Sequence, residues 1–285
     1  MAYKLITDSA CDVSREMLAG WGVELLNMCY RFTDDDVEHF DDMDIVDFYN
    51  AMKSGRVAKT AAINSETFRV TFEEYLKAGT DVLYLAFSSG LSSTCSSAFM
   101  TAKELNEKYP NKVVVVDTLC ASSGQGLLVY LASKKVAEGA SIDEVAEYVE
   151  SIRPNLSHWF TVDDLVYLKR GGRVSAAFAF FGNLLGIKPV LHVDDEGHLI
   201  AMQKVRGRRT ALNAIIDKFG ETALDPKNSV IFISHAQCQA DVDYVCAEVE
   251  KRYGAKVELV SDIGPVIGSH AGPGTLAFFF LGKER

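Results

Sequence analysis

The sequence contains cysteines but no paired arrangement of them. None of the six stands in C-x-x-C spacing with another, which argues against a zinc ribbon or a thioredoxin-type dithiol. In a chain of 285 residues, thiols this scattered are typical of reduced intracellular proteins, so we predict a cytoplasmic location. The six are Cys11, Cys29, Cys95, Cys120, Cys238 and Cys246.

Long apolar runs are also missing. The longest uninterrupted run near the C-terminus, Leu276 to Leu281, is far shorter than the ~18 residues that a membrane span needs. Only a few apolar residues precede Asp8, which is too few for a signal peptide. The sequence therefore predicts a soluble protein with no integral membrane association.

The sequence also lacks an excess of basic residues. The chain has 29 Lys and Arg against 39 Asp and Glu, a net charge of −10. Such a protein is not drawn to nucleic acid or to an anionic membrane, and we predict no nucleic-acid partner. It also lacks a Walker A motif, a complete G-x-G-x-x-G and H-E-x-x-H spacing. The sequence therefore predicts no cofactor and no metal site.

Strand-like and helix-like segments alternate in the first half of the chain. Residues 81–87 and 112–116 are nearly continuous apolar runs, as expected of strands buried on both faces. Helical patterns cover residues 92–109, 122–137 and 142–152, the last after the capping box Ser141-x-x-Glu144. This order predicts right-handed βαβ units and a parallel sheet.

The pattern changes after Pro154. Residues 189–193 and 198–205 flank an acidic turn ending in Gly197 and predict a β-hairpin, after which α/β alternation resumes. At ~100–200 residues per domain, the length allows two. We predict an α/β fold with an N-terminal parallel-sheet domain over residues 1–160 and a mixed-sheet α/β domain over residues 161–285.

The most informative stretch is residues 88–94, S-S-G-L-S-S-T, between a buried strand and a helix. Hydroxyls beside the free N–H groups of a helix N-terminus suit a carboxylate or a phosphate. Ordinary capping of the helix by one serine accounts for the same residues. A third interpretation is a nucleophile elbow resembling G-x-S-x-G, with Ser92 as nucleophile and His235 or His270 as base.

Two basic clusters and one glycine-rich segment complete the candidates. The clusters, residues 169–173 and 206–209, suit a phosphate or an acidic partner, or else the last carbonyls of a helix. Residues 264–275 place four Gly and two Pro around His270. A histidine on so restricted a backbone either bonds an oxyanion or ties the loop to a carbonyl.

Five segments together resemble the DegV family of bacterial fatty-acid-binding proteins. They match in order over about residues 3–282, and the third and fifth are long enough to be specific. The segments are residues 6–9 (I-T-D-S), 88–92 (S-S-G-L-S), 164–175 (D-L-V-Y-L-K-R-G-G-R-V-S), 186–191 (G-I-K-P-V-L) and 264–275.

The resemblance implies two α/β domains with a long-chain fatty acid buried between them and no catalysis by the chain alone. It also implies a partner, a separate ATP-dependent fatty acid kinase that converts the presented carboxyl group to an acyl phosphate. The positions that match the family's carboxylate site are Thr60 and Ser92, with His270 beside them. The basic residues facing the kinase or its phosphate would be Arg170, Arg173 and Arg206.

Two segments depart from the family pattern. The family's T-S-Q-P-S reads T-A-A-I-N at residues 60–64, and L-S-G-T-Y reads L-S-S-T-C at residues 91–95. Ser93 therefore replaces a glycine, and we include it among the ligand-binding candidates. The departures keep two alternatives open: a binder of another small carboxylate or phosphate, and a serine acyl hydrolase using Ser92 and His270. We interpret the apolar residues 176–185 as core.

Overall fold

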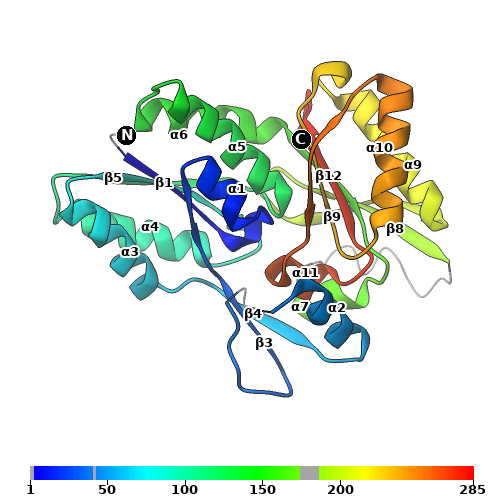
Figure 1. Ribbon diagram of the computed structural model, residues 1–285, viewed down its shortest axis with the longest axis horizontal. Helices are drawn as coiled ribbons and strands as arrows, with labels where there is room; N and C mark the ends of the chain where they lie inside the picture. Colours follow the sequence, from blue (N-terminus) through cyan, green and yellow to red (C-terminus); the bar gives the residue numbers. More distant parts are fainter. Residues whose placement is uncertain (1–2, 41–42, 174–185) are drawn as a thin grey trace.

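The computed structural model describes residues 3–40, 43–173 and 186–285 (Figure 1). Sheet A has the strand order β2-β1-β5-β6. All of its neighbouring strands pair in parallel, as the alternating sequence pattern predicted. Its strands are β1 (Tyr3–Asp8), β2 (Val23–Leu26), β5 (Asp81–Ala86) and β6 (Val113–Asp117).

Helices cover both faces of sheet A. On one face, α3 (Ser65–Lys77) and α4 (Thr94–Asn106) pack against Val82 and Tyr84 of β5. On the other, Leu83 and Leu85 belong to the same core as three further helices. Successive residues of a strand point to opposite faces, so a strand covered on both sides needs a continuous apolar run. The three helices are α1 (Arg15–Gly20), α5 (Ser123–Ala137) and α6 (Ile142–Ile152).

Sheet C is mixed, with the order β11-β10-β12-β7-β8-β9. Strands β10 and β11 pair in parallel and the other neighbours are antiparallel. Helices α9 (Arg208–Thr222) and α10 (Gln239–Tyr253) cover one face. The strands are β7 (Leu156–Thr161), β8 (Ile187–Val193), β9 (Leu199–Arg206), β10 (Ile231–His235), β11 (Val257–Asp262) and β12 (Leu276–Leu281).

Helix α5 lies between the two sheets (Figure 1). Its residues Leu127 and Leu128 share one hydrophobic core with Leu83 of sheet A and with Phe232 and Phe279 of sheet C. Residues 123–129 are all buried. The two sheets are therefore joined through a helix that has no solvent-facing side over its first two turns.

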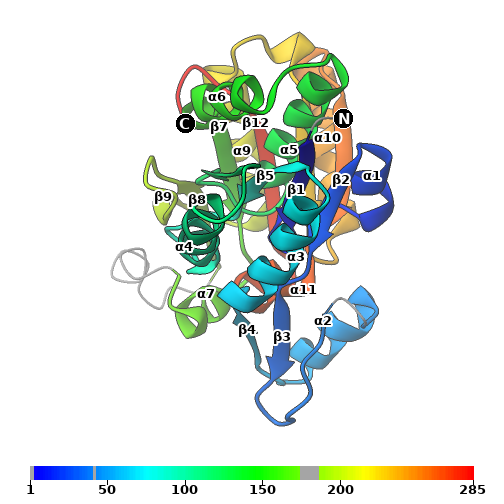
Figure 2. The same ribbon diagram turned by 90° about the vertical axis from the view of Figure 1, so that its left-hand side faces the viewer.

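A smaller layer lies below the sheets (Figures 1 and 2). The antiparallel strands β3 (Cys29–Phe32) and β4 (Ala58–Ala61) and helix α2 (Ile45–Lys53) pack beside α7 (Val166–Gly171) and α11 (Pro265–Ala271). The Tyr49 hydroxyl donates to the Ile263 carbonyl at 2.7 Å. Segments from both ends of the chain thus form one core. Short 3-10 turns cover Ser9–Cys11, Arg153–Asn155 and Pro226–Asn228.

The fold class predicted from the sequence is confirmed. The β8–β9 hairpin and the capping box of α6 are present as predicted. The helix expected from Ser92 begins at Thr94 instead. Strands of sheet A come from residues 3–117 and those of sheet C from residues 156–281, and the domain division at residue 160 stays a prediction. The apolar residues 176–185 lie outside the described residues.

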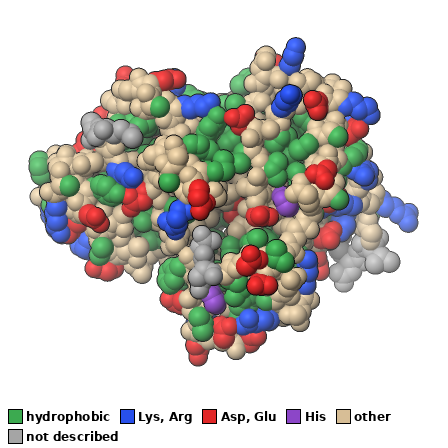
Figure 3. All heavy atoms as spheres, viewed as in Figure 1, with side chains coloured by type: hydrophobic (Ala, Val, Ile, Leu, Met, Phe, Trp, Pro, Cys, Tyr) green, Lys and Arg blue, Asp and Glu red, His purple; other side chains and the backbone are tan. Residues whose placement is uncertain are grey.

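Two surface properties bear on possible partners. Among the described residues, no helix is long and apolar enough to cross a membrane. Acidic and basic side chains are interspersed on the face shown in Figure 3, with no large field of one sign.

The first prediction concerns the contact of α5 with the start of the chain. A Cβ on Gly126 would lie 2.5 Å from Val13 Cγ2 and 2.9 Å from the Cys11 carbonyl oxygen, whereas a Cβ on Gly20 would meet nothing within 4 Å. We expect Gly126→Ala to lower the free energy of unfolding by about 1–3 kcal/mol through overpacking, and Gly20→Ala to leave it unchanged or slightly raised. Urea unfolding measures both, and equal midpoints would contradict the close packing of α5.

Candidate functional site

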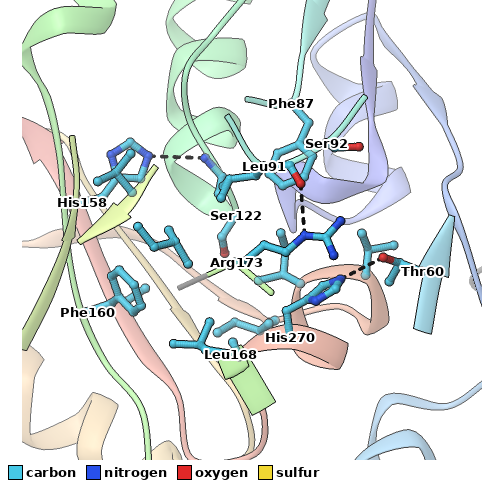
Figure 4. Close-up of a pocket in the computed structure, with 18 of the residues that line it drawn as sticks. Thr60, Phe87, Leu91, Ser92, Ser122, His158, Phe160, Leu168, Arg173 and His270 are labelled. Carbon is cyan, nitrogen blue, oxygen red and sulfur yellow. Dashed lines mark hydrogen bonds between the residues drawn. The ribbon is translucent and has the colours of Figure 1, made fainter. Parts of the chain in front are cut away.

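An apolar cavity of about 300 Å³ lies between the sheets. It lies just before the first residue of α5, next to Ala121 and Ser122. It also borders the loop that follows the carboxyl end of β5. Ligands of open parallel sheets bind at this edge, outside the carboxyl ends of the strands. Its apolar walls include Phe87, Leu91, Phe160, Leu168, Val266 and Phe279 (Figure 4).

One end of this cavity is polar. Thr60 of β4, Ser92 and Ser93 of the loop before α4, and His270 of α11 all line it. The Thr60 hydroxyl lies 2.8 Å from Nε2 of His270, although the two residues are 210 positions apart (Figure 4). The structure thus brings together all four residues that the sequence assigned to the ligand carboxylate.

Ser92 is held by the start of α4. Its Oγ accepts a hydrogen bond from the Thr94 N–H at 3.2 Å and lies 2.9 Å from the Thr94 hydroxyl. The Thr94 hydroxyl in turn accepts from the Ile63 N–H at 3.3 Å. Thr94 therefore links the segment that carries Thr60 to the loop that carries Ser92. Ser93 is the N-cap residue and is exposed, with no side-chain capping bond.

The loop that follows β5 is anchored by a buried carboxylate. Asp8, at the end of β1, accepts hydrogen bonds from the Tyr84 hydroxyl at 2.6 Å and from the Phe87 N–H at 2.9 Å. Burial raises the pKa of Asp8, although these donors oppose the shift. The motif I-T-D-S therefore supports the cavity indirectly, because its Asp8 fixes the loop that leads from β5 to Ser92.

His270 is uncharged at neutral pH. Burial, followed by the charge of Arg173, lowers its pKa to about 4. Its Nδ1 atom is buried and has no hydrogen-bond partner among the described residues. A Cβ on Gly171 would lie 2.1 Å from that atom, so the glycine of α7 is what allows the ring to fit.

Arg173 brings a positive charge to the same end of the cavity. Its Nε donates to the Leu91 carbonyl at 3.2 Å and its Nη1 to the Gly171 carbonyl at 2.5 Å. Burial lowers its pKa, and a guanidinium keeps its charge in proteins. No acidic side chain of the described residues pairs with it, so the guanidinium is available to a ligand anion.

A second cavity, of about 480 Å³, borders the Thr60–His270 pair. Its basic lining residues are Arg56, Lys59, Arg170 and Arg173, and no Asp or Glu of the described chain lines it. Arg56 is neutralised by its bonds to Asp34; Arg170 is exposed. Arg206 lies exposed at the end of β9 and lines neither cavity, so its predicted role stays a prediction.

The geometry does not assemble a hydrolytic triad from the described residues. Ser92 is bonded to Thr94, and the Nε2 of His270 is bonded to Thr60. His235, the other candidate base, does not line the cavity and lies 3.8 Å from Asp262. A serine nucleophile needs a base within hydrogen-bond reach and a third group that orients it. Among the described residues, no group of three or more His, Cys, Asp or Glu side chains could hold a metal ion.

Sequence reasoning missed three polar residues of the cavity wall, Ser122, His158 and Thr275. His158 lies in an apolar strand, and only its polarity at an alternating position between Leu156 and Phe160 marks it. Ser122 has φ of +54°, a left-handed conformation that is uncommon for a residue other than glycine.

The fold and cavity define a class: a two-sheet α/β protein with an apolar cavity between its sheets that is lined at one end by polar side chains. The family model described as "Uncharacterised protein, DegV family" matches residues 2–283. A DegV domain-containing protein of Clostridium perfringens is 41% identical over 99% of this chain and 98% of its own length. The chain belongs to the DegV family.

Two further relatives carry a description of what they bind. A protein of Thermotoga maritima named fatty acid-binding protein is 33% identical over 100% of this chain and 99% of its own length. The solved structure of a DegV family protein from Thermus thermophilus, which is described as showing fatty acid binding, superposes on this chain with a TM-score of 0.89. It is 32% identical, over 99% of this chain and 100% of that one.

The state of His270 generates the second prediction. Below its ordinary pKa of 6.5, this histidine takes up a proton in the unfolded chain but not in the folded one until the pH nears 4, so stability falls as the pH drops across this window. The variant His270→Gln lacks this titrating group, so it loses less stability on acidification. We expect the difference in unfolding free energy between pH 7 and pH 4 to be about 2–3 kcal/mol smaller in the variant than in the wild type. Urea unfolding of the lipid-free protein at both pH values measures it. Equal losses in both proteins would contradict a neutral His270.

Proposed function

We propose that this protein binds a long-chain fatty acid, with its carboxylate at the polar end of the cavity between the sheets and its acyl tail along the apolar walls. The observation that carries the proposal is the pairing of an apolar cavity with one polar end. The hydroxyls of Thr60, Ser92 and Ser93, a neutral imidazole and a guanidinium with no acidic partner among the described residues line this cavity. The fatty-acid-binding relatives support the same ligand class.

The energetics favour a long chain. Each buried methylene contributes about 0.8 kcal/mol, so a sixteen-carbon tail gains roughly 10 kcal/mol before the costs of association. The carboxylate must then be held without being neutralised. Hydroxyl and guanidinium donors stabilise its charged form, and a neutral His270 adds a hydrogen-bonding group without a further charge.

We also propose that the bound carboxylate is presented to a separate fatty acid kinase. In that reaction a carboxylate oxygen attacks the γ-phosphorus of ATP, and an acyl phosphate and ADP are formed. The second cavity supports this role, because it borders Thr60 and His270 and carries the exposed cation Arg170. Phosphate transfer needs such positive charge beside the reacting oxygen.

The third prediction tests the carboxylate site. Removing the Ser92 hydroxyl deletes a donor to a charged group, so Ser92→Ala weakens retention of hexadecanoate about tenfold or more, with unfolding free energy changed by less than about 1 kcal/mol. Ser96→Ala, an exposed serine on α4, is the matched control and retains the lipid. Native mass spectrometry followed by solvent extraction measures occupancy.

Three outcomes would overturn the assignment. Unchanged retention in Ser92→Ala removes Ser92 from the carboxylate site. Covalent labelling of Ser92 by a serine-reactive phosphonate, together with ester hydrolysis that Ser92→Ala abolishes, replaces the binding protein with an acyl hydrolase. A non-lipid anion recovered from the purified protein in place of a fatty acid changes the ligand class.

The fourth prediction tests presentation to the kinase. Arg170→Glu reverses a charge in the second cavity, so acyl phosphate formation with a cognate fatty acid kinase and ATP falls about tenfold or more, while retention of hexadecanoate is unchanged. The variant Arg206→Glu, measured in the same kinase assay, tests whether the more distant Arg206 also faces the kinase. Lys103→Glu, an exposed lysine on α4, is the control. Equal rates in Arg170→Glu and the control would show that the second cavity does not face the phosphate.

A further inference from the structure

The β8–β9 hairpin is attached to the rest of sheet C along only part of its length. Strand β7 pairs with β12 at all six of its residues. It pairs with β8 at one position of the described chain, Phe160 with Leu191. Next to that pair, Nδ1 of His192 donates to the His158 carbonyl at 2.8 Å. Towards its tip, the hairpin therefore depends on a side chain rather than on a backbone ladder for its attachment to β7.

A β-bulge divides the hairpin into two halves. The register shifts between Val190 and Leu191, which leaves Met202 as an extra residue in β9, and such bulges interrupt the ladder and bend the strand. Val190 packs in the core that α9 and α10 cover, whereas Leu191 belongs to the core between the sheets. We call residues 191–201 the distal half. Its last pair before the turn, Val193 with Leu199, lines the cavity, so movement of the distal half opens a cavity wall.

The tip of the hairpin is fastened to sheet A by a side-chain bond. The Ser88 hydroxyl, in the loop after β5, donates to the Gly197 carbonyl at 2.9 Å. Both residues are buried, and a Cβ on Gly197 would lie 2.1 Å from the Ser88 Oγ. The turn itself is rigid, because Asp194 Oδ1 accepts from the N–H groups of Glu196 and His198. The tip is therefore a single unit that the Ser88 bond holds against sheet A.

The residue that fastens the tip is also tied to the carboxylate site. The Ser88 carbonyl accepts the N–H of Ser92 at 3.1 Å. Ser92 lines the cavity, whereas Ser88 does not. A ligand bonded to Ser92 and the tip of the hairpin therefore share one turn of the chain, although Ser88 makes no contact with the cavity.

We infer that the distal half of the hairpin is a strap that opens by bending at the bulge to admit and release the acyl chain, and that the bond from Ser88 to Gly197 holds it closed. Burial of a long tail requires a wall that moves aside and then closes over it. This wall combines a short ladder, a bend and a side-chain fastening, which are features of segments that open locally. The inference rests on the proposed binding of a fatty acid.

The experiment uses kinetics to distinguish a gate from a ligand contact. Stopped-flow fluorescence with cis-parinarate, a fluorescent polyene fatty acid, gives the association rate, and its displacement by excess hexadecanoate gives the dissociation rate. Loss of the Ser88 bond makes opening more frequent in the free and in the bound protein alike. We expect Ser88→Ala to raise both rates about fivefold and to change the dissociation constant by less than about twofold. Amide hydrogen exchange at residues 191–201 becomes faster in parallel.

Matched variants control for lost stability. Ser157 is a buried serine that also donates to a backbone carbonyl, that of Glu284 at 3.1 Å, but does not line the cavity. Ser157→Ala leaves both rates unchanged. Gly197→Ala displaces the tip and raises both rates, whereas Gly186→Ala, with the same φ of +79° and no described atom within 4 Å of the new Cβ, does not. Should Ser88→Ala fail to fold, Ser88→Cys replaces it, because a thiol is a weaker donor.

The outcomes separate this inference from the proposed function. Faster dissociation with unchanged association in Ser88→Ala would show that Ser88 acts on the bound carboxylate through Ser92, and the strap is then overturned. Unchanged rates in both Ser88→Ala and Gly197→Ala do the same, while fatty acid binding stands. Failure of cis-parinarate and of hexadecanoate to bind overturns both.

Discussion

The cavity depends on one packing constraint: helix α5 separates the two sheets along its length and begins only at Ser123. Where the helix is present, its buried side chains fill the space between Leu83 and Phe279. Before its first residue the sheets remain apart, but no helix fills the space, and the cavity lies there. At the start of α5, Gly124 allows His158 and Phe279 of sheet C to approach closely, and Gly126 allows the turn after β1 at Cys11 and Val13 to do so.

The same arrangement explains the polarity of the cavity. The carboxyl edge of sheet A supplies loops that carry hydroxyl groups, and α11 and the chain after α7 supply His270 and Arg173. These groups lie in a partly dehydrated space, where an unpaired cation interacts more strongly with an anion than it does in water. Because His270 is neutral, the proposed binding mode sets one positive charge, that of Arg173, against one ligand carboxylate.

Much of the fold was readable from the sequence because its signals are local. The apolar run of β5, the capping box of α6 and the β8–β9 hairpin each show within about ten residues. The lower layer could not be predicted from the sequence. Its elements β3, β4, α2 and α11 are short and are stabilised by contacts between distant segments, such as that of Tyr49 with Ile263. Residues 264–275 read as a glycine-rich loop, yet Pro265 begins a helix there.

The candidate site follows the same division. Ser92 and His270 were singled out from local motifs, whereas Thr60 was found only through the family resemblance, because nothing local connects residues so far apart. Two of the departures from the family pattern have structural uses: Asn64 caps α3 by accepting from the Thr67 N–H at 2.9 Å, and Cys95 is a buried residue in the first turn of α4. Thr94, which both segments contact, preserves the link between Thr60 and Ser92. One departure lies in the site itself, because Ala62 lines the cavity at the position of the family's glutamine and brings no hydrogen-bonding side chain to it.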